Sequence, residues 1–191
     1  MNYNKQNILA NRLARAFLKN KIIKPLPSSL TKKLSVADNF RRLCESKINK
    51  PIIGFKAGGT GLPLIKKLNE KEPFVASIYK HNVKKNNKTI RINKYTLGIE
   101  LEVCYFIKKD FFKFNKKITL TNIKKFIIKI APCIEVVGYR QKKTGIKSFG
   151  DLSSDFGANI KFVIGPSKKY RNNFNVKNLK TKIFNVRENK A

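Results

Sequence analysis

Two strand-like apolar segments that carry glutamate constrain this chain most. Residues 97–107 contain Glu100 and Glu102, and residues 130–137 contain Glu135. Side chains alternate between the two faces of a half-buried strand, so Glu100 and Glu102 share one face while apolar residues occupy the other. Carboxylates on strands that otherwise form core destabilise the fold unless something positive compensates them.

The negative charge of these carboxylates can be accommodated in two ways. The Cα atoms of Glu100 and Glu102 would be roughly 6.6 Å apart along a strand, which suits a divalent cation with oxygen ligands, with Glu135 as the third carboxylate. Alternatively, the pair lies on the solvent face of an edge strand, or the carboxylates pair with lysines. Apolar neighbours on both sides of Glu135 favour the metal site.

Composition narrows the classes of protein. A chain of 191 residues that is 41% hydrophobic can bury one substantial core. It lacks an apolar stretch of 18 residues, so we expect no membrane span. One histidine and three cysteines without a CxxC pair leave little material for zinc or Ser-His-Asp chemistry. We expect a helical segment over 1–50, a β-rich region over 51–166 and a basic, loosely ordered tail over 167–191.

The formal charge of +32 has two explanations. A basic surface attracts nucleic acid or anionic membranes. However, only 8 of the 43 basic residues are arginine, and the lysines accompany abundant Asn, Ile and Phe, whose codons are A/T-rich. Because nucleic-acid-binding motifs are also missing, we do not expect nucleic acid to be the main partner.

Periodicity and turn residues predict the local structure. A helix over 8–19 is amphipathic, and a mitochondrial presequence is its alternative interpretation. The other expected elements are a helix opened by a Ser35–Asp38 capping pattern and ending near 48, a strand over 51–57, a glycine turn over 58–61, a short helix over 62–68, a charged hairpin or loop over 84–94, a helix over 121–130, and a strand over 159–164.

Five motifs, in this order, carry a family resemblance: Ile53-Gly-Phe-Lys56, Gly98-Ile-Glu-Leu-Glu102, Pro132-Cys-Ile-Glu-Val-Val-Gly-Tyr-Arg140, Asp151-Leu-Ser-Ser-Asp155 and Val163-Ile-Gly165. Together they resemble the 2-keto-4-pentenoate hydratase family of the fumarylacetoacetate hydrolase superfamily, which includes 2-oxohept-3-enedioate hydratase and 4-oxalocrotonate decarboxylase. The resemblance spans residues 8–166 and argues against a cleaved presequence. It implies an α+β fold, a mixed curved β-roll with flanking helices. Because the family's final helix and strand motifs do not follow, we expect a chain truncated at its C-terminus.

The resemblance also implies a function: a metal-dependent lyase, a hydratase or decarboxylase for 2-oxo or 2-hydroxy-dienoate acids such as 2-hydroxypenta-2,4-dienoate. Such an enzyme of aromatic compound catabolism is expected to be cytoplasmic and homo-oligomeric, without a membrane partner. The alternatives are a non-catalytic paralogue and a basic anion-binding protein.

The same resemblance assigns roles to residues. Mg²⁺ or Mn²⁺ would be held by the three glutamates. The implied catalytic residues are Lys56 and Asp155, and the implied substrate-binding residues are Arg140 and Asp151. Without the resemblance, Lys56 reads as one more lysine that extends from a strand to solvent. One segment and two single residues depart from the family pattern: Pro73-Phe-Val-Ala76, Gly138 and Phe156.

Overall fold

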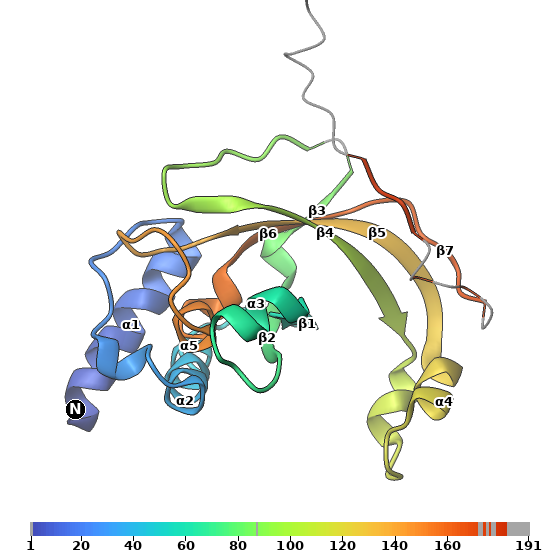
Figure 1. The fold of residues 1–191 in the computed structure, drawn as a ribbon, viewed down its shortest axis with the longest axis horizontal. Coiled ribbons are helices and arrows are strands. Elements are labelled where there is room, and N and C mark those ends of the chain that lie inside the picture. The colour runs from blue at the N-terminus through green and yellow to red at the C-terminus, as the bar shows by residue number, and fades with distance from the viewer. Residues whose placement is uncertain (1, 87, 172–173, 175, 177–178, 183–191) are drawn as a thin grey trace, which may run out of the picture. The chain divides into compact units, whose positions relative to one another are not determined.

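The structure is a computed structural model that describes residues 2–86, 88–171, 174, 176 and 179–182. Among the described helices, none is both long enough and apolar enough to cross a membrane. The helices and strands, shown in Figure 1, are α1 (Tyr3–Lys19), α2 (Leu34–Glu45), β1 (Ile52–Gly58), α3 (Leu62–Lys67), β2 (Phe74–Tyr79), β3 (Val83–Lys85), β4 (Thr96–Ile107), α4 (Leu120–Ile123), β5 (Ile127–Gly138), α5 (Phe149–Ser153), β6 (Asn159–Ile164) and β7 (Lys168–Lys169).

The chain divides into two compact units. The first comprises residues 1–100 and 134–164, and the second comprises residues 101–133 and 165–191. β1 and β2 form a two-stranded antiparallel sheet. A second sheet has the strand order β3-β6-β5-β4, and β7 also pairs with β5. The long strands β4 and β5 contribute residues to both units.

In the first unit, α1, α2 and α5 pack together beside β2 (Figure 1). α1 buries Leu9, Leu13 and Phe17, which recur at helical spacing. Its N-cap is Asn2, whose side chain accepts a hydrogen bond from the backbone of Asn4. The helix therefore begins five residues before the predicted start.

The predicted capping pattern of the second helix was wrong. α2 begins at Leu34, one residue before Ser35, and its N-cap is Lys33, which makes no side-chain capping bond. Ser35 and Asp38 therefore both lie inside the helix. Asp38 instead pairs with Arg41 one turn later, at 3.6 Å.

β1 alternates as predicted. The side chain of Lys56 is only 8% exposed, whereas Ile53 and Phe55, on the other face of the strand, are 52% and 62% exposed. Lys56 pairs in register with Ala76 on β2. The lysine therefore enters the first unit, and the apolar residues of the same strand face outward.

Gly138, at the end of β5, departs from the family pattern for a steric reason. A Cβ atom added here would lie 2.8 Å from the carbonyl oxygen of Tyr95 and 2.9 Å from the Cα of Thr96. The backbone of Tyr139 also donates a hydrogen bond to that Tyr95 oxygen, at 3.0 Å. In this fold, the close approach of the Tyr95–Thr96 backbone leaves space for glycine alone.

In the second unit, the predicted helix over 121–130 was wrong. α4 has four residues, a 3₁₀ turn follows at Lys124–Phe126, and Ile127 already begins β5. The β-branched residues Ile127, Ile128 and Ile130 favour an extended backbone, and strand pairing outweighs the helical periodicity. Phe126 packs edge-on against Phe111, with ring centroids 5.4 Å apart.

The expected tail over 167–191 falls largely outside the described residues. In its described part, Lys168 and Lys169 pair with Ile130 and Lys129 of β5. The predicted three-part division of the chain stays a prediction.

Candidate metal centre

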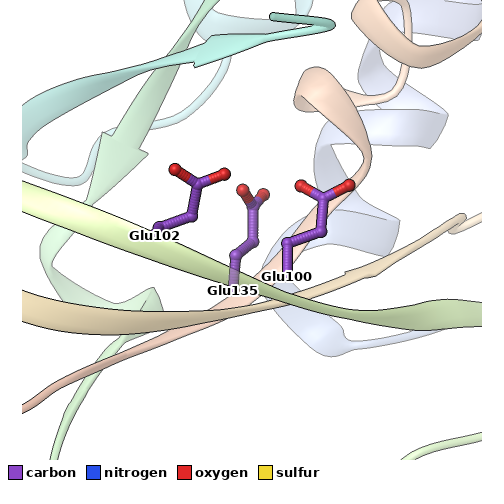
Figure 2. Close-up of side chains that lie close together, drawn as sticks. All are labelled: Glu100, Glu102 and Glu135. Atoms are coloured by element: carbon purple, nitrogen blue, oxygen red, sulfur yellow. The ribbon is translucent and has the colours of Figure 1, made fainter. Parts of the chain in front are cut away.

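Three carboxylates converge where β4 and β5 lie next to each other. Glu100 and Glu102 are two residues apart on β4, and Glu135 is on β5. Figure 2 shows the three side chains projecting to the same side of the strands. One oxygen from each carboxylate lies within 4.8 Å of the others. The structure therefore contains the predicted convergence, while the role of the glutamates as metal ligands stays a prediction.

Glu135 is the buried member of the cluster, at 1% exposure. Its Oε1 accepts hydrogen bonds from Lys56 Nζ at 2.5 Å and from Asn159 Nδ2 at 3.1 Å. Burial raises the pKa of Glu135, and the negative charge of Glu100 raises it further, against the opposing effects of Lys56 and Asn159. Burial therefore outweighs the stabilising effect that Lys56 and Asn159 have on the ionised carboxylate of Glu135.

The second oxygen of Glu135, Oε2, is buried and has no hydrogen-bond partner among the described residues. A buried carboxylate oxygen without a partner destabilises a fold, so native structures nearly always satisfy such atoms. A cation beside Oε2 would satisfy this atom, and Glu100 and Glu102 supply the further oxygens. An all-oxygen donor set suits Mg²⁺, Mn²⁺ or Ca²⁺. These residues therefore fit a divalent metal.

Lys56 is held by the 3₁₀ turn Phe156–Ala158 as well as by Glu135. Its Nζ donates to the Gly157 carbonyl oxygen at 3.3 Å. Phe156, Gly157 and Ala158 all have left-handed backbone conformations, with φ of 55°, 69° and 55°. Such conformations are strained for residues other than glycine, and they concentrate at functional sites.

A cavity of about 190 Å³ opens beside the carboxylates in the first unit. Lys56 and Glu100 are its charged lining residues. Glycines 58, 59, 98 and 157 and Ile99 also line it. The rest of its wall is apolar and consists of Leu64, Phe74, Leu97, Val137, Ile146 and Leu152.

Asp155 and Arg140, two of the predicted site residues, pair with each other and do not line this cavity. Asp155 is fully buried and accepts hydrogen bonds from the Arg140 backbone at 2.8 Å and from Gln141 Nε2 at 2.9 Å. The Arg140 guanidinium lies 4.4 Å from the ring centroid of Phe17. The surroundings of both residues are those of a buried structural ion pair.

Asp151 is also buried outside the cavity lining. It accepts hydrogen bonds from Tyr139 Oη at 3.0 Å and Lys143 Nζ at 2.6 Å. Desolvation and the charge of Asp151 raise the pKa of Tyr139, so this phenol stays protonated and donates. The assigned roles of Asp151, Asp155 and Arg140 stay predictions.

Asn159 and Gly157 are the site residues that sequence reasoning missed. Asn159 is 2% exposed and holds Glu135 from the first position of β6. Gly157 presents its carbonyl oxygen to Lys56. The available signal was a polar residue at the start of an apolar strand, two positions after a glycine.

The fold class follows from the strand order, the flanking helices and the placement of the carboxylates. This is a mixed α+β fold of the fumarylacetoacetate hydrolase type, as expected. No protein-family model and no curated protein matches the sequence.

The individual similarities are to solved structures. One is 4-oxalocrotonate decarboxylase from Pseudomonas putida G7 complexed with magnesium and adipate, at a TM-score of 0.65 and 16% identity, over 86% of this chain and 64% of that one. Another is the same enzyme complexed with calcium and acetate, at a TM-score of 0.62 and 15% identity, over 86% and 63%. The chain thus spans less than two thirds of the length of these structures.

Proposed function

We propose that this protein is a divalent-cation-dependent lyase that acts on a 2-oxo or 2-hydroxy-dienoate acid. The observation that carries the proposal is the unpartnered buried oxygen of Glu135 inside a cluster of three carboxylates. The shared fold supports it, because the similar solved structures hold magnesium with adipate and calcium with acetate. Each pairs a divalent cation with a carboxylic acid.

In this proposal, Glu100, Glu102 and Glu135 hold Mg²⁺ or Mn²⁺. When bound, the cation would act as a Lewis acid toward the C1 carboxylate and C2 oxygen of the acid. Asn159 orients Glu135 through its hydrogen bond to Oε1. Supporting bonds of this kind keep a ligating carboxylate in one orientation.

In the proposed reaction, Lys56 either transfers a proton or binds the carboxylate of the substrate. Its ammonium lies on the cavity wall, 2.5 Å from Glu135 Oε1, so it can hold an acid beside the cation site or move a proton there. Hydratase action on 2-hydroxypenta-2,4-dienoate is the particular reaction we propose, with decarboxylation as the alternative for an acid that carries a second carboxylate. A homo-oligomer is part of the proposal, because Ile53 and Phe55 expose apolar surface on β1.

The test is an assay of 2-hydroxypenta-2,4-dienoate that follows the loss of dienol absorbance. The protein is stripped with EDTA and then supplied with Mg²⁺ or Mn²⁺. We expect turnover only with added cation, and a loss of about 100-fold or more in Glu135→Gln, which removes a ligand. Glu72→Gln, the same change at an exposed glutamate outside the cluster, should retain activity.

Calorimetric titration with Mg²⁺ separates the alternatives. Cation binding that is lost in Glu135→Gln, without turnover of any dienoate, would favour the non-catalytic paralogue. Equal cation binding by the wild type and Glu135→Gln would overturn the proposed metal site.

A further inference from the structure

A groove of about 480 Å³ lies on the surface of α1. It is separate from the metal centre, because it shares no lining residue with the cavity beside the carboxylates. Its lining residues all fall between positions 8 and 23, so the groove belongs entirely to the first unit. The proposed lyase chemistry leaves this part of the molecule without a role.

The groove forms because the chain reverses direction at the end of α1. The C-cap Asn20 has a left-handed backbone with φ of 50°, and Lys21 donates its backbone N–H to the Ala16 carbonyl oxygen at 3.0 Å. Ile23 then donates to the Arg140 carbonyl oxygen at 2.9 Å, which fixes the returning segment. The helix and the segment that follows it together form the wall of the groove.

Four of the lining residues are basic, and none is acidic. Arg12, Arg15 and Lys19 follow one another at helical spacing, so they share one face of α1, and Lys21 adds a fourth charge from the returning segment. Arg12 and Lys19 are separated by roughly 10 Å along the helix axis. All four side chains are exposed, and none forms an ion pair with a described residue. The groove therefore presents four uncompensated positive charges.

The share of arginine distinguishes this groove from the lysine-rich surface around it. Only 8 of the 43 basic residues in the chain are arginine, whereas the groove has two arginines and two lysines. The planar guanidinium of arginine matches the geometry of a phosphate and binds it through two parallel hydrogen bonds, and lysine binds phosphate as a point charge. This combination favours phosphate groups over other anions.

The rest of the lining suits an organic group attached to phosphates. Ile8, Ala16 and Ile23 provide apolar surface, and Asn11 provides an amide that can both donate and accept hydrogen bonds. Ile8 lies one turn before Arg12 on the same face of α1, so apolar surface and positive charge adjoin. The volume also lies within the roughly 300–1,000 Å³ typical of small-molecule sites.

Two larger anionic partners fit this part of the molecule less well. None of the lining residues is aromatic, so the groove lacks the stacking surface on which single-stranded nucleic acid binds. The apolar face of α1, with Leu9, Leu13 and Phe17, is buried in the core of the first unit. The folded helix therefore cannot insert this face into a membrane, as an interfacial amphipathic helix does.

We propose that the groove on α1 binds a nucleotide, a small molecule that carries linked phosphates next to an apolar ring. The phosphates contact the four basic residues, and the ring packs on Ile8 beside the amide of Asn11. This site is independent of the three glutamates and adds a second ligand to the one proposed for the metal centre.

The experiment titrates the full chain calorimetrically with ATP, tripolyphosphate and adenosine. Divalent cations are first removed with EDTA, which is then dialysed away, and about 150 mM NaCl screens weak binding to the basic surface. We expect ATP to bind about 10-fold more tightly than tripolyphosphate, because its ring buries apolar surface. Adenosine alone should show no measurable binding, since it lacks the phosphates.

The double variant Arg12→Gln, Arg15→Gln tests the location of the site. Glutamine preserves helix propensity and removes both guanidinium groups, so ATP affinity should fall about 30-fold or more. The double variant Arg42→Gln, Arg91→Gln is the matched control. It removes the same two charges from exposed positions outside the groove, so ATP affinity should change less than about 3-fold.

Lys19→Gln, Lys21→Gln is a second groove variant for the case that the arginine variant does not fold, and it should also weaken ATP binding. An equal loss of affinity in the groove and control variants would overturn the proposed site, because general charge attraction would then explain the binding. Equal affinities for ATP and tripolyphosphate would overturn the nucleotide assignment. A short single-stranded RNA that displaces ATP and binds more tightly would assign the groove to nucleic acid instead.

Discussion

The sequence context of Glu135 allowed two interpretations, a metal ligand or the partner of a lysine, and its two carboxylate oxygens differ in this respect. It pairs with a lysine, as the alternative to metal binding required. However, Lys56 satisfies only Oε1, and Oε2 stays buried without a described partner. The ion pair therefore leaves Oε2 as the atom that a cation would satisfy.

At the same scale, we predict opposite effects of Glu100→Gln on the stability of the metal-free protein and on metal affinity. Glu100 repels Glu135, so the substitution should raise the free energy of unfolding in EDTA by about 1 kcal/mol. It should also weaken Mg²⁺ binding about 10-fold or more, because it removes a ligand oxygen charge. Urea unfolding and calorimetric titration measure the two quantities.

Glu72→Gln is the matched control for Glu100→Gln. It removes the same charge from an exposed residue of a strongly basic chain, so it should leave stability unchanged or slightly lower it. A Glu100→Gln protein that unfolds at lower urea concentration than the wild type in EDTA would contradict the predicted repulsion.

Among the elements, the 3₁₀ turn Phe156–Ala158 does most to position the site. It links the buried Asp155 to Asn159, and its left-handed backbone aims the Gly157 carbonyl oxygen at Lys56. A Cβ on Gly157 would lie 2.6 Å from the Cβ of Ala76 on β2. The turn therefore requires glycine for both conformational and steric reasons.

We predict that Gly157→Ala destabilises the fold by about 2 kcal/mol or more, since it adds a clash to a left-handed position. It should also weaken Mg²⁺ binding, because the displaced turn would move Lys56 and Asn159. Gly61→Ala is the control: Gly61 has φ of −76°, and an added Cβ would meet no atom within 4 Å. Equal denaturation midpoints for the two variants would show that the turn tolerates a side chain.

For the whole molecule, the charge of +32 is the dominant property. The acidic residues are few, and several are already used in buried ion pairs: Asp155 with Arg140, Asp151 with Lys143 and Glu135 with Lys56. Most lysines are left to repel one another across the surface. Repulsion of this kind weakens a compact state and is screened by salt.

We predict that salt stabilises the protein. Raising NaCl from about 20 mM to about 500 mM should increase the melting temperature by about 3 °C or more, because screening relieves the repulsion. KCl should raise the melting temperature as much as NaCl does. Sucrose at matched osmolarity adds no ions, so it should not reproduce the dependence of the melting temperature on ionic strength. A melting temperature that falls with salt would indicate that favourable ion pairs outweigh the repulsion.

The residue pattern alone determined which side chains share a face. Glu100 and Glu102 on one side of β4, Lys56 opposite Phe55, and β6 over residues 159–164 all follow from local alternation, which depends only on backbone geometry. The family motifs added the α+β fold type. The expected cytoplasmic location and homo-oligomer stay predictions.

Tertiary structure decided which distant groups meet. Lys56 and Glu135 are 79 residues apart in sequence, and only tertiary packing brings Lys56 Nζ to 2.5 Å from Glu135 Oε1. The same packing placed Asp155 and Arg140 in a buried pair outside the cavity lining, and strand pairing made residues 127–130 extended against their helical periodicity. Local pattern sets the direction of a side chain, whereas burial and strand pairing set its partner, because these depend on contacts between remote segments.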